Sequence, residues 1–231
     1  MTKFLASVRT VEEAELACAG GADVIDAKDP ARGALGRLPD AVIREIVDAV
    51  AGRRPVSATI GDMELDRLRV TEAVRALAET GVDIVKIGMF PGDAVGTLAC
   101  LKAAAIERIA LVAVFLADRN PDLTLLDDCH AAGFHGVMLD TADKASGPLT
   151  CHFDETALRR FIALGHEYGF MVGLAGSLRR DDVARLGRLR PDYLGFRSAL
   201  TAGRRHDALD TESIAAIRGA IDAVAPVATM G

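Results

Sequence analysis

Short apolar runs alternate with longer amphipathic segments from one end of the chain to the other. The runs consist mainly of Val, Ile, Leu and Ala, and this composition is typical of parallel strands that are covered on both faces. They predict strands at Phe4–Val8, Val24–Lys28, Val56–Ile60, Ile84–Gly88, Ile109–Leu116, Gly136–Asp140, Met171–Ala175 and Tyr193–Arg197.

The segments between the strands have the period and the end signals of helices. Thr10 with Glu13 three residues later forms a capping box, and Gly20 and Gly21 end the helix that it begins. The later helices are predicted at Pro39–Ala51, Glu64–Thr80, from about Pro91–Asp93, Leu123–Ala132, Glu155–Tyr168, from Gly176–Ser177 to Leu189, and Thr211–Val224.

Eight strand–helix units with short connections predict an α/β fold, a (β/α)8 TIM barrel. The alternative is a doubly wound open sheet, which usually has fewer strands and a switch point in the strand order. No linker, low-complexity segment or short repeat interrupts the pattern. We therefore expect residues 1–231 to form one catalytic domain.

The composition of the chain limits the kinds of molecule that it is expected to bind. The 231 residues are 50% hydrophobic and 26% charged, with a net charge of -6 and a pI near 5.4. An acidic chain is a poor match for nucleic acid or an anionic membrane surface, although a local cluster of cations could still hold a small anionic substrate. No apolar run is long enough to span a membrane, and the first residues lack a signal peptide. We expect a cytoplasmic protein.

The four cysteines predict neither disulfides nor a metal centre. None of them forms a CxxC pair, so a reduced state is expected. Cys129-His130 and Cys151-His152 are adjacent pairs, whose side chains point in different directions, whereas zinc ligands are normally spaced along the chain. We expect no metal and no cofactor.

Polar side chains gather where the predicted strands end, and barrel enzymes carry their catalytic groups at these carboxyl ends. Asp26 and Lys28 are two residues apart, so they share one face of their strand. Taken in order, the strand ends and the residues just after them supply Ser7, Asp26, Lys28, Thr59, Lys86, Asp140, Lys144, Gly176, Ser177, Arg197 and Ser198.

Lysine usage draws attention to three of these positions. Five of the 27 basic residues are lysines and the other 22 are arginines. Lys28, Lys86 and Lys144 all lie at the predicted barrel mouth. Arginine can supply charge there, but it cannot easily lose a proton or act as an amine nucleophile. The distribution therefore favours lysine chemistry.

Each candidate also has a purely structural interpretation. Lys28 could be a rim residue paired with Asp26 or Asp29, and Lys86 could form a buried pair with Asp26 or Asp140. Asp140 could only cap the following turn, and Lys144 could be an ordinary surface lysine. Three amines and two carboxylates around one barrel mouth are stronger evidence for a site than any one of them.

Such a set supports imine formation. A lysine amine attacks a carbonyl, neighbouring ammonium groups keep more of it neutral, and Asp or a second Lys moves protons. Gly176 and Ser177 after strand seven, with Arg197 and Ser198 after strand eight, occupy the places where barrels commonly bind phosphate. Gly-Ser is also common in turns, so this part of the prediction depends on the barrel.

Four segments carry a resemblance to a known family: GGADVIDAKDPARGALG at 20–36, SATIGD at 57–62, VDIVKIG at 82–88 and MLDTADK at 138–144. With them the chain resembles the (5-formylfuran-3-yl)methyl phosphate synthases over essentially its full length. These are also called 4-(hydroxymethyl)-2-furancarboxaldehyde-phosphate synthases, and they serve the biosynthesis of methanofuran-type one-carbon carriers.

The resemblance implies condensation of two glyceraldehyde 3-phosphates to a phosphorylated furan aldehyde, with loss of one phosphate and two waters and without a cofactor. It implies Lys28 as the Schiff-base residue, and proton-transfer or phosphate-binding roles for Lys86, Lys144, Asp26 and Asp140. The remaining alternatives are an ordinary Schiff-base aldolase or sugar-phosphate isomerase and a non-catalytic phosphometabolite-binding barrel. Apolar outer helices such as Ala94–Ala105 suggest a homo-oligomer.

Overall fold

Eight parallel strands close into a barrel in the computed structural model, which describes residues 1–106, 108–203 and 207–224. Neighbours in the sequence are neighbours in the barrel, and β1 also pairs with β8, with Phe4 opposite Leu194. The strands are β1 (Lys3–Val8), β2 (Val24–Ala27), β3 (Val56–Thr59), β4 (Ile84–Gly88), β5 (Ala110–Leu116), β6 (Gly136–Asp140), β7 (Met171–Leu174) and β8 (Tyr193–Phe196). The predicted TIM barrel is confirmed.

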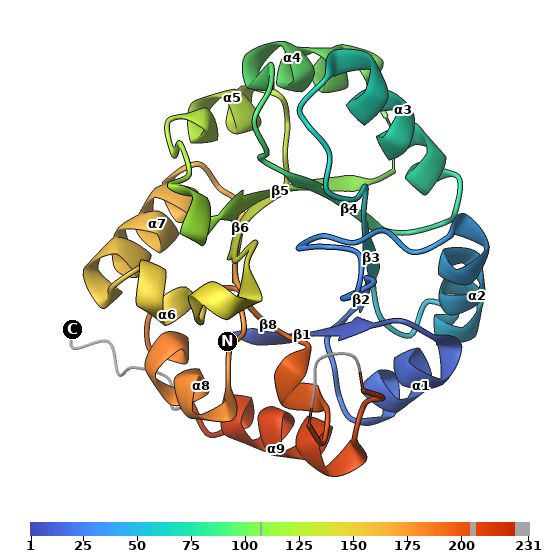
Figure 1. The fold of residues 1–231 in the computed structure, drawn as a ribbon, viewed down its shortest axis with the longest axis vertical. Helices are drawn as coiled ribbons and strands as arrows, with labels where there is room; N and C mark the ends of the chain where they lie inside the picture. Colours follow the sequence, from blue (N-terminus) through green and yellow to red (C-terminus); the bar gives the residue numbers. More distant parts are fainter. Residues whose placement is uncertain (107, 204–206, 225–231) are drawn as a thin grey trace.

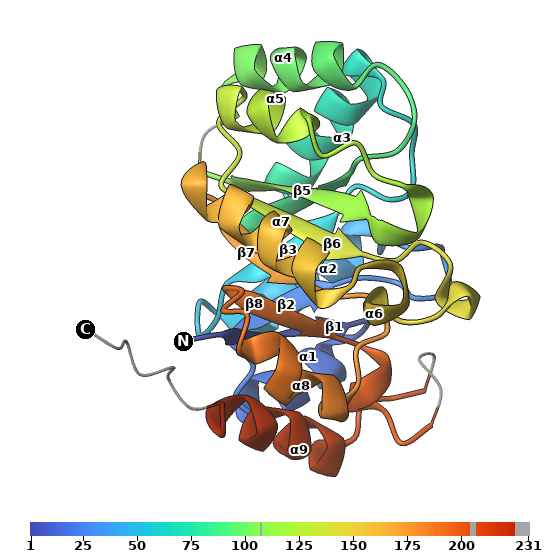
Figure 2. The same cartoon turned by 90° about the vertical axis from the view of Figure 1, so that its left-hand side faces the viewer.

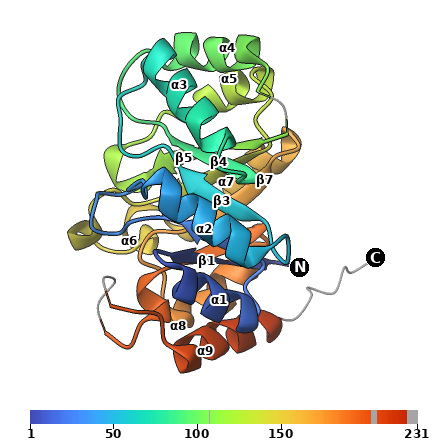
Figure 3. The same cartoon turned by 90° about the vertical axis from the view of Figure 1, so that its right-hand side faces the viewer.

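Helices surround the barrel (Figure 1). They are α1 (Val11–Ala19), α2 (Asp40–Val50), α3 (Arg67–Ala78), α4 (Ala94–Ala104), α5 (Leu125–Ala131), α6 (Leu149–His152), α7 (Glu155–Glu167), α8 (Arg180–Gly187) and α9 (Thr211–Asp222). Three short 3₁₀ helices, η1 (Ala117–Arg119), η2 (Lys144–Ser146) and η3 (Ser198–Leu200), follow β5, β6 and β8. Figures 2 and 3 show the barrel from two sides, with α6 at the end toward which the strand arrows point. None of the helices in the described ranges is long and apolar enough to cross a membrane.

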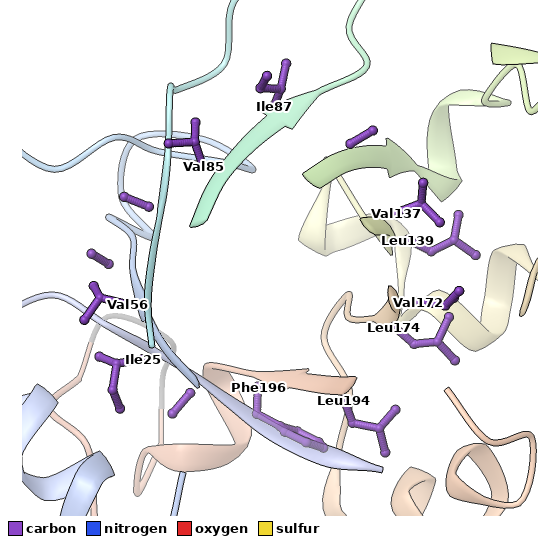
Figure 4. Packing of buried hydrophobic residues seen from close by; sticks show 14 of the residues in the cluster. Ile25, Val56, Val85, Ile87, Val137, Leu139, Val172, Leu174, Leu194 and Phe196 are labelled. Atoms are coloured by element: carbon purple, nitrogen blue, oxygen red, sulfur yellow. The ribbon is translucent and has the colours of Figure 1, made fainter. Parts of the chain in front are cut away.

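The strand pattern separates two layers of core. Outward-facing residues such as Ile25, Val85 and Leu174 pack against the helices (Figure 4) and belong to one large buried cluster. Inward-facing residues form a smaller cluster inside the barrel that includes Leu5 and Met138. Because side chains alternate along a strand, a polar residue at an inward position faces the barrel interior and not a helix. This alternation places the chemistry of the chain inside the barrel.

One predicted boundary is wrong in a way that matters for the site. Gly176 and Ser177 do not open the helix after β7, because α8 begins at Arg180 with Arg179 as its N-cap. The two residues have φ of +103° and +52°, in the left-handed region that a right-handed helix cannot contain. They form a turn ahead of the helix.

Candidate active site

A cavity opens among the carboxyl ends of the strands and contains the predicted lysines of β2 and β4. Its empty space, which includes part of the open mouth, is about 440 Å³. Its lining residues are Leu5, Ser7, Asp26, Lys28, Lys86, Met138, Asp140, Ala175, Gly176, Ser177, Gly195, Phe196, Arg197 and Ser198. Of the predicted site residues whose side chains are described, only Thr59 is not among them.

Glycines on two strands shape the floor of this cavity. A Cβ added at Gly173 of β7 or at Gly195 of β8 would lie 3.1 Å from the side chain of Met138. Met138 is buried, and it fills interior space that larger residues on β7 and β8 would occupy. The floor is therefore apolar, while the polar groups stand above it.

Lys86 and Asp26 form the deeper of two buried Lys–Asp ion pairs at the cavity. Lys86 Nζ lies 2.6 Å from Asp26 Oδ1, and both side chains are almost completely buried. Ser57 donates a hydrogen bond of 2.7 Å to the same oxygen, and Ser7 donates one of 2.9 Å to Oδ2. Both carboxylate oxygens thus accept good hydrogen bonds, which is the condition under which a buried charge is tolerated.

Burial shifts the pKa values of the two partners in opposite directions: it acts to raise that of Asp26 and to lower that of Lys86. Burial of the Asp26 carboxyl by itself would raise its pKa, but the ammonium groups of Lys86 and Lys28 and the hydrogen bonds outweigh it, so the pKa is lowered. Burial is the largest influence on Lys86 and lowers its pKa, although Asp26 partly opposes the shift. A lysine with a lowered pKa exchanges its proton more readily near neutral pH, as a catalytic acid or base must.

Lys28 makes the second buried Lys–Asp pair, which spans the barrel from β2 to β6. Its Nζ lies 3.1 Å from Asp140 Oδ2. The two residues follow β2 and end β6, which are four strands apart in a ring of eight. Asp140 Oδ1 accepts the backbone N–H of Thr141 at 2.7 Å. The structural alternative for Lys28, a pair with Asp26 or Asp29, is not what the structure contains, whereas the predicted Lys86–Asp26 pair is present.

The turn after β7 presents unused hydrogen-bond donors to the cavity. Within the described residues, the backbone N–H groups of Gly176 and Ser177 donate no hydrogen bond. A Cβ at Gly176 would lie 2.9 Å from Thr141, so only glycine fits against the end of β6. Free N–H groups in a turn are suitable partners for an anion.

Arg197 is more firmly engaged than its predicted phosphate-binding role requires. Its guanidinium forms a forked pair with Glu13 of α1, at 2.6 and 3.1 Å, and also donates to the carbonyls of Ser7 and Asp207. Arg197 lines the cavity, yet these contacts make it first of all a clamp between β8, β1 and α1. Ser198, which follows it, starts η3 and also lines the cavity.

The Arg197–Glu13 clamp gives a stability prediction. Glu13→Gln is expected to lower the free energy of unfolding by about 3 kcal/mol, because it leaves a buried guanidinium without its counter-charge. Urea unfolding followed by circular dichroism measures the change. Glu12→Gln, on the exposed neighbour in the same helical turn, is the control and is expected to change little. Equal effects of the two substitutions would contradict the interpretation of Arg197 as a clamp.

Thr59 does not line the cavity. It is completely buried beside Lys86 in the sheet, where its hydroxyl donates to the Leu35 carbonyl at 2.9 Å and accepts the Gly61 N–H. The structure therefore does not bring it to the site. The backbone of Lys144 lies in η2, but its side chain is outside the described residues.

The sequence analysis did not select Ser57, Glu13, Asp62 or Asp118. Asp118 follows β5, and its oxygens accept the N–H groups of Ala142 and Asp143 at 2.6 and 2.7 Å, which fixes the loop that leads to Lys144. Ser57 could have been found, because it is a polar residue at an inward position of a buried strand. Glu13 was predicted only as part of a helix cap, because its partner Arg197 is 184 residues away and gave no local signal.

The Asp26 carboxyl predicts how stability depends on pH. Its pKa in the folded protein is below its ordinary value of 3.8, so its contribution is present above that value and is lost as the pH falls through the folded pKa. Asp26→Asn is expected to flatten the fall in stability between about pH 5 and pH 3. Urea unfolding of both proteins at several pH values measures it. Equal acid slopes would show that Asp26 titrates normally.

Among the described residues, no group of three or more His, Cys, Asp and Glu side chains could hold a metal ion. The groups that the cavity does offer are two amines, two carboxylates, hydroxyls and free backbone N–H donors. This set can bind an oxyanion, form an imine with a carbonyl compound and move protons.

Comparisons with known proteins identify the family of the chain. The family described as 4-HFC-P synthase matches residues 4–218. A protein of Methylorubrum extorquens, named provisionally as a (5-formylfuran-3-yl)methyl phosphate synthase, is 41% identical over 92% of this chain and 89% of its own length. The enzyme of that name from Methanosarcina acetivorans is 32% identical over 92% of this chain and 96% of its own length.

Solved structures show the fold alone. Phosphoribosyl anthranilate isomerase from Thermus thermophilus has a TM-score of 0.70 at 17% identity and covers 97% of this chain and 100% of its own. The 3-keto-L-gulonate-6-phosphate decarboxylase from Vibrio cholerae has a TM-score of 0.69 at 13% identity, with 97% of this chain and 99% of its own covered. The fold is therefore shared widely among enzymes, while the sequence match is specific: the chain belongs to the 4-HFC-P synthase family.

Proposed function

We propose that this enzyme condenses two glyceraldehyde 3-phosphates into 4-(hydroxymethyl)-2-furancarboxaldehyde phosphate through an imine on Lys28. The observation that carries the proposal is the pair of buried Lys–Asp contacts lining one cavity at the carboxyl ends of the strands. The names of the relatives indicate the product, and the free donors at Gly176 and Ser177 suit a substrate phosphate. The product would serve a methanofuran-type one-carbon carrier.

Lys28 suits the nucleophile better than Lys86 does. A contact of 3.1 Å to Asp140 holds it, whereas Lys86 lies 2.6 Å from an aspartate that two serines also fix. Asp140 can take the proton that Lys28 must lose before it attacks, and can return a proton when the carbinolamine loses water. Lys86 and Asp26, deeper in the cavity, are positioned to move protons at the neighbouring carbon.

The overall reaction balances without an oxidant or a reductant. The nitrogen of Lys28 bonds to the carbonyl carbon of one triose phosphate, and water leaves as the imine forms. Removal of the adjacent proton gives an enamine, whose carbon attacks the aldehyde of the second triose phosphate. Elimination of phosphate, ring closure and loss of two further waters complete the furan, and one water hydrolyses the C=N bond to release the Lys28 amine. Two triose phosphates thus yield the furan phosphate, one phosphate and two waters.

The test is a product assay with adduct mapping. The enzyme is incubated with glyceraldehyde 3-phosphate, the furan is measured by its absorbance, and released phosphate is measured in the same tube. We expect one phosphate for each furan. Borohydride added during turnover should leave a triose-phosphate adduct on the tryptic peptide that contains Lys28. An adduct without furan or phosphate would indicate a simple Schiff-base aldolase, and turnover without any adduct would rule out the imine.

A further inference from the structure

The loop after β2 folds inward over the barrel mouth instead of lying on the rim. Figure 1 shows this blue loop reaching between the strands. Asp29 N–H donates to the Gly36 carbonyl at 2.8 Å, which closes the loop, and Leu35 between them is completely buried. Leu35 belongs to the cluster inside the barrel and would touch a Cβ added at Gly88, the last residue of β4. A fully buried leucine in a mouth loop is not required by any step of the imine chemistry.

Two side chains after β3 hold this loop in place. The buried Thr59 hydroxyl donates to the Leu35 carbonyl at 2.9 Å. The Asp62 carboxylate accepts the N–H groups of Ala34 at 2.9 Å and Leu35 at 2.7 Å. The N–H groups of Ala34 and Leu35 and the carbonyl of Leu35 are therefore satisfied by one neighbouring strand end, which favours a single loop position.

Glycine is required for the loop to take this course. Gly33 has φ of +108°, and a Cβ there would lie 2.1 Å from Asp62 Oδ2. A Cβ at Gly36 would lie 2.1 Å from the carbonyl oxygen of Asp29. The backbone can approach Asp62 and close on itself only because both side chains are absent.

The loop divides the mouth into two spaces. The lysine cavity takes its lining from β1, β2, β4 and β6–β8, with no residue of β3 or β5. Gly33 and Ala34 instead line a second, wider cavity of about 1740 Å³, open to solvent, together with Leu116 of β5 and Ala142. The two cavities share no lining residue. Leu35 lines neither cavity, and its apolar cluster contains Met138 of the lysine cavity and Leu116 of the second cavity.

We propose that Leu35 is a partition that closes the lysine cavity on its β3–β5 side, and that Thr59 and Asp62 are positioning residues that hold the partition. Lys28, which is only 6% exposed, is then reached from the β1–β8 side alone. An imine on Lys28 is shielded from water in the wider cavity. Reaction with the second carbonyl compound is therefore favoured over hydrolysis of the imine. This last consequence rests on the proposed imine function, whereas the partition itself does not.

The test measures access to Lys28 without substrate. Formaldehyde with cyanoborohydride methylates accessible amines, and tryptic mass spectrometry gives the rate at Lys28 separately from the exposed Lys102. Leu35→Ala is expected to raise the Lys28 rate at least about tenfold, because it opens a second entrance. Leu125→Ala, the same truncation at a residue that lines only the second cavity, is the control and is expected to leave the rate unchanged.

Asp62→Asn provides an independent measurement on a side chain at the surface, where folding is little affected. Amide hydrogen exchange at Ala34 and Leu35 is expected to accelerate about fivefold, because the amide can accept from only one of the two N–H groups. Lys28 methylation should also rise. Asp93→Asn, the same substitution at a helix N-cap on the rim of the second cavity, should change neither readout.

The results of these experiments distinguish failure of the partition from failure of the proposed reaction. Unchanged Lys28 methylation in both Leu35→Ala and Asp62→Asn would overturn the partition, as would an equal rise in Leu125→Ala. If the wild-type enzyme failed to release phosphate or a furan, the proposed reaction would be wrong, and the methylation result would still decide whether the partition exists. Where turnover is present, loss of the partition should lower kcat more than it raises KM.

Discussion

Lys28→Arg is expected to abolish adduct formation and to lower turnover by a factor on the order of 10³ or more. The guanidinium retains the positive charge beside Asp140, so binding of an anionic substrate and the buried ion pair can both persist. It cannot give a neutral amine near neutral pH, and the nucleophile is lost. Intact mass after borohydride treatment and the rate of phosphate release measure the two effects.

Lys102→Arg is the matched control for this substitution, because Lys102 is exposed on α4 away from the cavity. It should keep full activity and the full adduct. Residual activity of Lys28→Arg above a few percent of wild type would contradict a nucleophilic role. An adduct that persists in the Lys28→Arg protein would move the imine to another lysine, with Lys86 the first to be examined.

Lys86→Met is expected to have the largest effect on stability. It leaves the Asp26 carboxylate in the barrel interior without the ammonium 2.6 Å away. Breaking a buried pair from one side costs about 3 to 5 kcal/mol of unfolding free energy, because the remaining charge is no longer compensated. The serines that donate to Asp26 and the nearby Lys28 place our expectation near the lower end of that range. Urea unfolding at neutral pH measures it.

The double variant Asp26→Asn/Lys86→Met tests the cause. Removal of both charges should recover at least half of the stability that Lys86→Met loses, because an uncharged amide and a thioether carry a far smaller desolvation cost. Neither Lys86→Met nor the double variant should have enzymatic activity. If the two substitutions were simply additive in stability, the pair would not be coupled, and the loss in Lys86→Met would have to come from packing alone.

The partners in the two Lys–Asp ion pairs could not be predicted from the sequence around each residue. Asp26, Lys28, Lys86 and Asp140 were identified because each interrupts or follows an apolar run, which is a property of its own strand. Which amine meets which carboxylate depends on the position of each strand around the ring. Lys28 meets Asp140, 112 residues away and on the opposite strand, because the barrel closes.

The local sequence was also insufficient to predict the structural roles of Gly176, Ser177 and Thr59. Glycine and serine after a strand fit both a helix start and a turn, and only the backbone angles distinguish the two. Thr59 has an inward position on its strand, but the loop carrying Leu35 covers it and engages its hydroxyl. No pattern within β3 could indicate that a loop from a different strand would lie over it.

The sequence by itself determined the eight strand–helix units, the barrel and the set of amines and carboxylates at its mouth. These follow from the period of apolar residues, from caps and glycines, and from the scarcity of lysine, all of which are local. Only the tertiary structure decided the two Lys–Asp pairs, the Arg197–Glu13 clamp and the inward course of the Leu35 loop. Their common physical reason is distance along the chain: each is a contact between segments whose approach is fixed by barrel closure and packing.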